Sequence, residues 1–315
     1  MPQEFHADPP SDVIQKNPRV TLGMPVYNGE NFIREALDSL VAQTFTDFEV
    51  IISDNASTDK TEQICRSYAD RDRRIKYIRQ EINKGGFFNF NYLLNSASGE
   101  YFTWVAHDDF LDQNFLKEMV AHLDQYPDVA ICSCDFRVVG QDGKVIRYEY
   151  LEDIRSHKAW AQAQKGFFYY PISNIYLAIY GVFRLSIFRK YNIGLVKFWD
   201  GLTANSELPF LSRVAIRGKI ASIPSVLRTY RQHNNSGYYQ EFFKTGNITR
   251  MLHKWTVRFD QVYVLFTSQM AFFRKMGILT KMAGVWAKNS FHTTVLTRMA
   301  VLRNLFRKIL QIDRR

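Results

Sequence analysis

Hydrophobic positions in the first 106 residues alternate between two spacings. Short runs of β-branched and aromatic residues predict four strands, at 19–26, 48–52, 75–78 and 101–106. Apolar residues three and four positions apart predict the helices between them, at 30–43, from Ser57 or Thr58 to about 68, and at 87–97. This alternation is typical of a parallel β-sheet covered by helices, so the sequence predicts an α/β fold.

The next 125 residues have a looser pattern. It predicts a helix at 115–125, a strand at 129–139, and a hairpin turn at Gln141-Asp142-Gly143-Lys144 before a strand at 145–150. The stretch 151–180 is rich in aromatic residues, which fit either core packing or a platform that stacks on a sugar. Beyond it we expect a strand at 181–184, a helix at 206–216, and short strands at 219–223 and 226–230 around Pro224.

Polar or glycine-containing stretches follow each strand of the predicted parallel sheet. They are Tyr27-Asn28, Asp54-Asn55, Asn83 to Gly85, and Asp108-Asp109. The carboxyl ends of parallel strands meet at one edge of an open sheet, where ligands bind. Four such loops at one edge predict a binding site of nucleotide size.

Asp108 and Asp109 are adjacent carboxylates at the end of a buried strand. Neighbouring carboxylates repel each other unless a cation or a donor neutralises them, and a divalent cation shared with substrate phosphates would do so. The other reading is a helix N-cap, for which Asp109 or Asp112 is suitable. The pair alone leaves both readings open.

Composition places the chain among globular proteins. Of its 315 residues, 46% are hydrophobic and 23% are charged, which suits one large domain with an appendage or two small domains. Residues 1–18 lack the apolar core of a signal peptide, and no apolar run is long enough to span a membrane. Three cysteines cannot build a disulfide framework, so we expect a reducing, cytoplasmic location.

The net charge of +10 lies entirely in the tail, because residues 236–315 hold fourteen basic and three acidic residues. Within it, 285–310 predicts an amphipathic helix with basic residues opposite or flanking its apolar face. Such a tail fits a helical bundle packed on the main domain or on a second copy, or a helix lying on an anionic membrane. Nucleic acid is disfavoured because no binding motif is present.

Taken together, these stretches resemble the family 2 glycosyltransferases with the GT-A fold. The resemblance covers 18–236 and rests on motifs that recur in family order: Val26-Tyr27-Asn28, Gln43 to Ile51, Ser53 to Asp59, Asn83-Lys84-Gly85, Ser98 to Tyr101, Asp108-Asp109, Tyr180 to Arg184, Glu207, Arg217-Gly218-Lys219, and Tyr230 to Ser236. It implies a Rossmann-like mixed sheet flanked by helices. Outside the resemblance, we expect a polar arm at 1–17 and a basic helical extension at 237–315.

The resemblance also implies an activity. Members transfer a sugar from a nucleoside-diphosphate sugar to an acceptor hydroxyl, usually with inversion. It implies that Pro25, Val26 and Tyr27 lie along the base and ribose, and that Asp54 accepts from a base N–H. Asn83 and Gly85 would pass close to the nucleotide, where a side chain at Gly85 would clash. Asp54 has an alternative role as the cap of the next turn.

A cation site and a catalytic base complete the expected machinery. By resemblance, Asp108, Asp109 and His233 hold Mn²⁺ or Mg²⁺ against the diphosphate, with Asp108 also facing the nucleotide. Glu207 takes the proton of the acceptor hydroxyl. His233 alternatively fits an ordinary loop histidine, and Glu207 a first-turn acid that complements a helix dipole.

Two positions depart from the family pattern. The usual Asp-x-Asp motif has Ala106 at its first position here, a loss for which His107 is a candidate replacement, and Glu207 is followed by Leu208. These departures motivate an alternative function, a non-catalytic member that binds a sugar nucleotide or a partner. We expect a UDP-sugar donor, a glycan or lipid-linked acceptor, and a peripheral position on the inner face of the cell membrane in polysaccharide biosynthesis.

Overall fold

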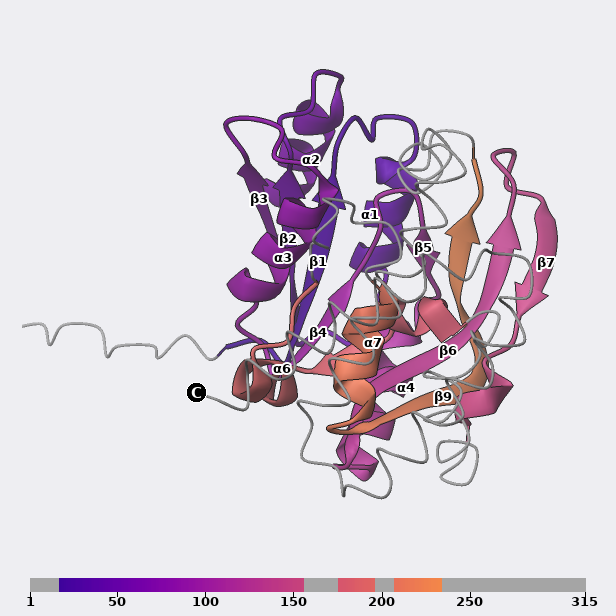
Figure 1. Cartoon of the computed structure of the whole chain (residues 1–315). Coiled ribbons are helices and arrows are strands. Elements are labelled where there is room, and N and C mark those ends of the chain that lie inside the picture. The colour runs from indigo at the N-terminus through magenta and orange to yellow at the C-terminus, as the bar shows by residue number, and fades with distance from the viewer. Residues whose placement is uncertain (1–16, 156–174, 196–206, 234–315) are drawn as a thin grey trace, which may run out of the picture.

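A mixed nine-stranded β-sheet with helices packed against it forms the body of the molecule (Figure 1). The computed structural model describes residues 17–155, 175–195 and 207–233. The expectations for the N-terminal arm, for much of the aromatic-rich stretch and for the basic tail therefore fall almost wholly outside the described residues. The strand order is β3-β2-β1-β4-β8-β6-β9-β5, and β7 pairs with β6.

The first half of the sheet is parallel, as predicted. Strands β1 (Val20–Val26), β2 (Phe48–Asp54), β3 (Ile75–Arg79) and β4 (Tyr101–Trp104) run in the same direction. Helices α1 (Ile33–Val41), α2 (Thr61–Ala69) and α3 (Gly86–Ser96) connect them. Helix α1 buries Ile33, Leu37 and Leu40, the positions that the helical spacing marks as apolar.

The predicted start of α2 is wrong. Neither Ser57 nor Thr58 caps the helix, which begins at Thr61 without a side-chain cap at Lys60. The Ser57 hydroxyl instead accepts the backbone N–H of Asn28 at 2.9 Å, and the Asp59 carboxylate accepts the N–H of Thr61 at 3.0 Å. Ser57 is therefore used to join two loops rather than to begin a helix.

The second half of the sheet is mixed. Its strands are β5 (Phe110–Leu111), β6 (Val129–Val139), β7 (Val145–Glu149), β8 (Val182–Arg184) and β9 (Lys219–Arg231). Helix α4 (Phe115–Gln125) lies between β5 and β6 in the sequence. Two 3₁₀ segments, η1 (Glu152–Ile154) and η2 (Ile175–Tyr180), and two helices, α6 (Leu185–Tyr191) and α7 (Glu207–Ala215), complete the described chain. The sequence pattern predicts neither β5 nor α6.

The two short strands expected around Pro224 form one strand, β9. Its pairing with β6 shifts register between Cys134 and Phe136, opposite the stretch that contains Pro224. Proline has no N–H to donate, so it is tolerated at such an irregularity rather than within a regular ladder. The strand therefore continues through the proline and carries its last residues to the same end of the molecule as β5.

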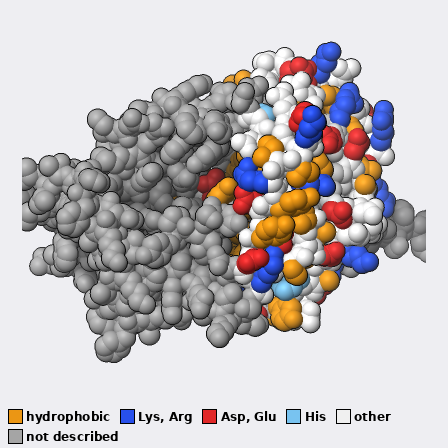
Figure 2. All heavy atoms as spheres, turned by 90° about the vertical axis from the view of Figure 1, so that its right-hand side faces the viewer, with side chains coloured by type: hydrophobic (Ala, Val, Ile, Leu, Met, Phe, Trp, Pro, Cys, Tyr) orange, Lys and Arg blue, Asp and Glu red, His pale blue; other side chains and the backbone are white. Residues whose placement is uncertain are grey.

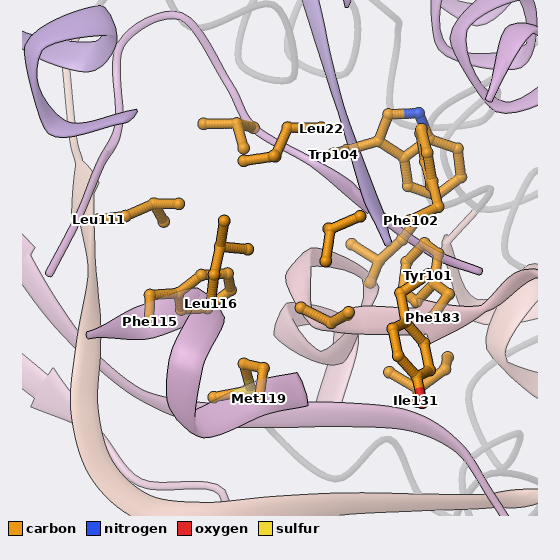
Figure 3. Close-up of a cluster of buried hydrophobic side chains, with 14 of the residues drawn as sticks. Leu22, Tyr101, Phe102, Trp104, Leu111, Phe115, Leu116, Met119, Ile131 and Phe183 are labelled. Carbon is orange, nitrogen blue, oxygen red and sulfur yellow. The ribbon is translucent and has the colours of Figure 1, made fainter. Parts of the chain in front are cut away.

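The core lies on both sides of β4 (Figure 3). Helix α4 brings Phe115, Leu116 and Met119 to the cluster, and all three are fully buried. Trp104 packs edge-on against Phe102 and Phe183 with ring centroids 5.1 and 5.2 Å apart. Because Trp104 is the last residue of β4, this packing fixes the point from which the chain enters the predicted site.

Strand β7 presents an exposed surface at one side of the molecule. Its side is turned to the viewer in Figure 2, where hydrophobic side chains lie among acidic and basic ones. On β7, Ile146 is 55% exposed and Tyr148 is 47% exposed. No helix within the described ranges is long and apolar enough to cross a membrane.

Glu49 on β2 ties the sheet to the turn before β4. Its carboxylate accepts hydrogen bonds from Thr21 (2.8 Å) and Ser98 (2.7 Å), and Lys76 lies 2.7 Å away. Burial alone would raise the pKa of Glu49, but the hydrogen bonds from Lys76, Ser98 and Thr21 outweigh it, so the pKa is lowered. The charged form of Glu49 therefore stabilises the fold.

We expect Glu49→Gln to lower the free energy of unfolding by about 1–3 kcal/mol at neutral pH. A lowered folded-state pKa gives stability that is present above the ordinary value of 4.5 and lost as the pH falls through the folded value. The difference in the free energy of unfolding between wild type and variant, measured by urea denaturation, should therefore become smaller below about pH 4.5. Glu152→Gln, at a carboxylate whose side chain is 74% exposed, is the control. A gap that stays constant down to acid pH would contradict the prediction.

Candidate functional site

The loops after β1, β2 and β3 are joined into one surface at the carboxyl edge of the sheet. The N–H of Asn55 donates to the carbonyl of Val26 at 2.9 Å, and the N–H of Gln80 donates to the carbonyl of Asp54 at 2.8 Å. The amide of Asn55 donates to the side-chain oxygen of Asn83 at 2.7 Å. The predicted nucleotide residues are thus brought together at one edge, as the order of loops indicates.

Asp54 is fully buried within this surface. One of its oxygens accepts the N–H of Ser57 at 2.8 Å, and the other accepts the hydroxyl of Tyr77 at 2.6 Å and a guanidinium N–H of Arg79 at 3.2 Å. The structure therefore gives Asp54 the role of shaping the turn after β2, one of the two readings of the sequence. Contact with a base N–H stays a prediction.

The remaining predicted nucleotide residues line the same edge. Pro25 and Val26 are buried within β1, and Tyr27 beyond them is 46% exposed. Gly85 has a φ of 83°, and a Cβ built there would meet no atom of the protein within 4 Å. A glycine is needed at this position for its left-handed backbone, whatever the distance to a nucleotide.

Asp108 and His233 meet across 125 residues of sequence. The Nε2 atom of His233 lies 2.8 Å from Oδ2 of Asp108, and both side chains are largely buried. The His233 ring also packs against Phe32, with ring centroids 5.0 Å apart. Burial opposes ionisation of Asp108, but the hydrogen bond from His233 and the charges of His107 and His233 hold its pKa below the ordinary value.

Asp109 faces away from this pair. Its Oδ1 accepts the backbone N–H of Arg231 at 3.0 Å, and its Oδ2 lies 3.9 Å from the guanidinium of Arg228. Burial, and then the charge of Asp108, raise the pKa of Asp109 well above its ordinary value. The cap reading is wrong for both candidates, because α4 begins after Asn114 without a side-chain cap, and the carboxylate of Asp112 accepts the N–H of Asn114 just before the helix.

The predicted cation ligands therefore come together in part. No group of three or more histidine, cysteine, aspartate or glutamate side chains that could hold a metal ion forms within 17–155, 175–195 and 207–233. Asp108 and His233 nevertheless supply an oxygen and a nitrogen 2.8 Å apart. Such a pair fits a divalent cation that takes its other ligands from water and substrate phosphates, so the residues present are compatible with Mn²⁺ or Mg²⁺.

Glu207 begins α7, and an aromatic cluster holds that helix in place. The ring of Phe210 lies 5.4 Å from Trp104, 5.6 Å from Phe183 and 5.4 Å from Phe188. Burial raises the pKa of Tyr180, and the nearby charges of Asp109 and Glu207 raise it further. The helix that begins at Glu207 and the end of β4 are therefore held by the same aromatic rings.

Two arginines in the second half of the sheet have different positions. Arg184 donates to the carbonyls of Leu123 and Val129 near the amino end of β4, away from the site. Arg228 is buried and donates to the carbonyls of Tyr180 (2.7 Å) and Trp104 (3.0 Å). Arg228 therefore fixes the site from inside, and the signal for it in the sequence is a charge within an otherwise apolar strand.

His107 packs against Gly29, which follows the first strand-end loop. A Cβ at Gly29 would lie 2.6 Å from Cδ2 of His107 and 2.8 Å from Cγ2 of Val26. We expect Gly29→Ala to lower the free energy of unfolding by about 1–3 kcal/mol, because one extra methyl overpacks the contact. Urea denaturation measures this effect. Gly86→Ala, where a Cβ would meet nothing within 4 Å, should lack it, and equal losses in the two variants would refute the explanation.

Comparison with known proteins places the first part of the described chain, up to α6, in a known family. A family model described as Glycosyl transferase family 2 matches residues 21–191. Glycosyltransferase GlyA of Streptococcus pneumoniae is 37% identical over 114 residues, which are 36% of this chain and 16% of that protein. An uncharacterized glycosyltransferase of Rickettsia typhi, RT0329, is 37% identical over 126 residues, 40% of this chain and 38% of that protein. The chain thus spans less than half the length of both relatives.

Solved structures share the architecture at low sequence identity. S. aureus TarS 1–349 in complex with UDP-GlcNAc has a TM-score of 0.65 and 18% identity, covering 89% of this chain and 77% of that chain. The mannosyltransferase PcManGT from Pyrobaculum calidifontis, in complex with GDP-Man and Mn²⁺, has a TM-score of 0.54 and 16% identity, covering 92% and 80%. These likenesses establish the fold.

Proposed function

We propose, on the premise that this chain belongs to glycosyl transferase family 2, that it transfers a sugar from a nucleoside-diphosphate sugar to an acceptor hydroxyl. The expected GT-A fold is confirmed by the likeness to TarS. The observation that carries the proposal is the meeting of Asp108 and His233, 2.8 Å apart, beside three joined strand-end loops. Ligands of open α/β sheets bind at this edge.

The donor would lie across the joined loops. The base and ribose would contact Pro25, Val26 and Tyr27, with Asp54, Asn83 and Gly85 shaping the surface beneath them. TarS binds UDP-GlcNAc and PcManGT binds GDP-Man, which supports a nucleoside-diphosphate sugar as donor. We infer a UDP-sugar because the TM-score to TarS is the higher of the two.

A divalent cation, Mn²⁺ or Mg²⁺, would be held by Asp108 and His233. When bound, such an ion neutralises the charge that develops on a leaving diphosphate. Of the chain's own residues, His107 lies beside Asp108 and supports its negative charge. Asp109 is the third cation ligand that the resemblance implies. In the structure its carboxylate accepts the backbone N–H of Arg231 and lies near the guanidinium of Arg228, and these contacts hold the turn.

Glu207 would act as the base. A carboxylate that takes the acceptor proton on the side opposite the diphosphate permits a single displacement, which inverts the anomeric centre. The acceptor would be a glycan or a lipid-linked sugar, as expected for polysaccharide biosynthesis. The same proposal divides the chain into a polar arm at 1–17, a catalytic domain at 18–236 and a basic tail at 237–315. It also includes contact of the basic tail with an anionic membrane on the cytoplasmic side or with a second copy of the chain.

The competing function is binding without transfer. Ala106 and Leu208 favour it, because the first acid of the family motif is missing and the acid that often follows the base is replaced by an apolar residue. A protein of this kind would bind a sugar nucleotide but leave it intact when an acceptor is supplied.

Thermal unfolding with a panel of nucleotide sugars separates the two functions. The proposal expects one donor to raise the melting temperature more with Mn²⁺ than without it, since a ligand that binds the native state stabilises it. Transfer to an acceptor, with the product's anomeric configuration read by NMR, then tests catalysis and inversion. Stabilisation without turnover would support binding alone, and no stabilisation by any donor would contradict both forms of nucleotide binding and leave a partner-binding member.

A further inference from the structure

Arg231, two residues before His233, connects three parts of the molecule through one buried side chain. Its guanidinium pairs with Glu35 of α1, donates to the carbonyl of Asp108 at 3.2 Å, and reaches the carbonyl of Gln141 at 3.4 Å. The side chain is only 5% exposed. A guanidinium is suited to this position because its planar fork donates in several directions at once.

Aromatic rings enclose the same guanidinium. Its central carbon lies 4.8 Å from the ring centroid of Phe32 and 5.7 Å from that of Phe110. Phe32 is also the ring against which His233 packs, at 5.0 Å. Arg231 therefore contacts the backbone of one candidate cation ligand and the ring that supports the other.

The hydrogen bonds of Arg231 argue against direct contact with a diphosphate. Each of its three side-chain nitrogens faces a partner within the protein, namely Glu35 and the carbonyls of Asp108 and Gln141. Its backbone N–H is also engaged, by the carboxylate of Asp109 at 3.0 Å. A buried side chain whose three nitrogens each have a partner within the protein acts on a ligand through the residues it holds.

We propose that Arg231 and Glu35 form a positioning pair that sets the geometry of Asp108 and His233 for a divalent cation. This inference rests on the proposed function. Glu35 lies on the helix that follows the first strand-end loop, so the pair joins the nucleotide side of the site to its cation side. Residues behind a metal ligand commonly change metal affinity when they are replaced, because they orient the ligand.

The test measures Mn²⁺ binding by the full chain in the presence of UDP or GDP, whichever the wild type binds. The electron paramagnetic resonance signal of free Mn²⁺ reports how much of the ion remains unbound. We expect Arg231→Lys and Glu35→Gln each to raise the dissociation constant for Mn²⁺ about tenfold. Binding of the nucleotide without Mn²⁺ should be unchanged. The double variant should match the single ones, because two residues that act as a unit are not additive.

Arg19→Lys is the matched control. Arg19 is likewise an arginine that pairs with acidic side chains, Glu100 at 3.0 Å and Asp124 at 2.7 Å, but it does so before β1 at the opposite edge of the sheet. Wild-type Mn²⁺ affinity in Arg231→Lys, or an equal loss of nucleotide binding without Mn²⁺, would overturn the positioning role alone. A wild-type protein that binds a nucleotide but no Mn²⁺ would overturn the positioning role and the cation part of the proposed function together.

Discussion

Asp108→Asn is expected to lower the rate of cation-dependent sugar transfer by about 10²–10⁴-fold, because the charge stabilisation that a bound cation supplies is several kcal/mol. An asparagine keeps the size of the side chain and one oxygen but removes the charge that faces His233. Initial rates with and without Mn²⁺ measure the effect. The loss should be large with Mn²⁺ present and small in its absence.

Asp112→Asn is the control for this change. Asp112 is exposed four residues further on, and its carboxylate accepts the N–H of Asn114 at 2.9 Å. The same chemical replacement there leaves the candidate site intact, so the transfer rate should stay close to that of the wild type. Equal rates for wild type and Asp108→Asn would remove Asp108 from the cation site.

Glu207→Gln is expected to lower kcat by about 10²–10⁴-fold with little change in the KM for the donor. The amide is nearly isosteric with the carboxylate but cannot accept the acceptor's proton, and the proposed nucleotide contacts are made by other residues. Steady-state kinetics over a range of donor and acceptor concentrations separate kcat from KM.

The alternative role of Glu207 as a first-turn acid has its own signature. Glu118 occupies the first turn of α4, away from the site, and so provides the matched variant Glu118→Gln. If Glu207 only complements the helix dipole, both replacements should cost about 0.3–1 kcal/mol of stability and leave kcat unchanged. A normal kcat in Glu207→Gln would therefore favour the dipole role over the base.

Local patterns predicted the parallel half of the sheet well, because each strand there is followed by a helix that packs beside it. The failures lie where distant segments pair. Strand β5 contains only Phe110 and Leu111, and it exists because those residues pair with Thr229 and Arg228 of β9. No periodicity can appear in two residues, so the strand is invisible without its partner.

Pairing between distant segments also decides which side chains of the candidate site lie together. The family resemblance implies that Asp108 and His233 share a site, and in the structure they lie 2.8 Å apart, but it does not indicate that Asp109 turns toward Arg228 and Arg231. Asp108 and Asp109 lie in the turn between β4 and β5, so strand alternation does not orient them, and the direction of Asp109 depends on the partners that β9 provides. The role of Glu35 has no local signal at all, since on α1 it reads as an ordinary first-turn acid.

The 125-residue separation of Asp108 from His233 has a consequence for synthesis of the chain. At about 5–20 residues per second, roughly 6–25 s pass between the emergence of these two residues. During that interval the loops after β1, β2 and β3 can join, since all their partners have been made, while Asp109 still lacks Arg228 and Arg231. We therefore expect the nucleotide side of the site to form first on the ribosome, and the cation side to form only when β9 has been added.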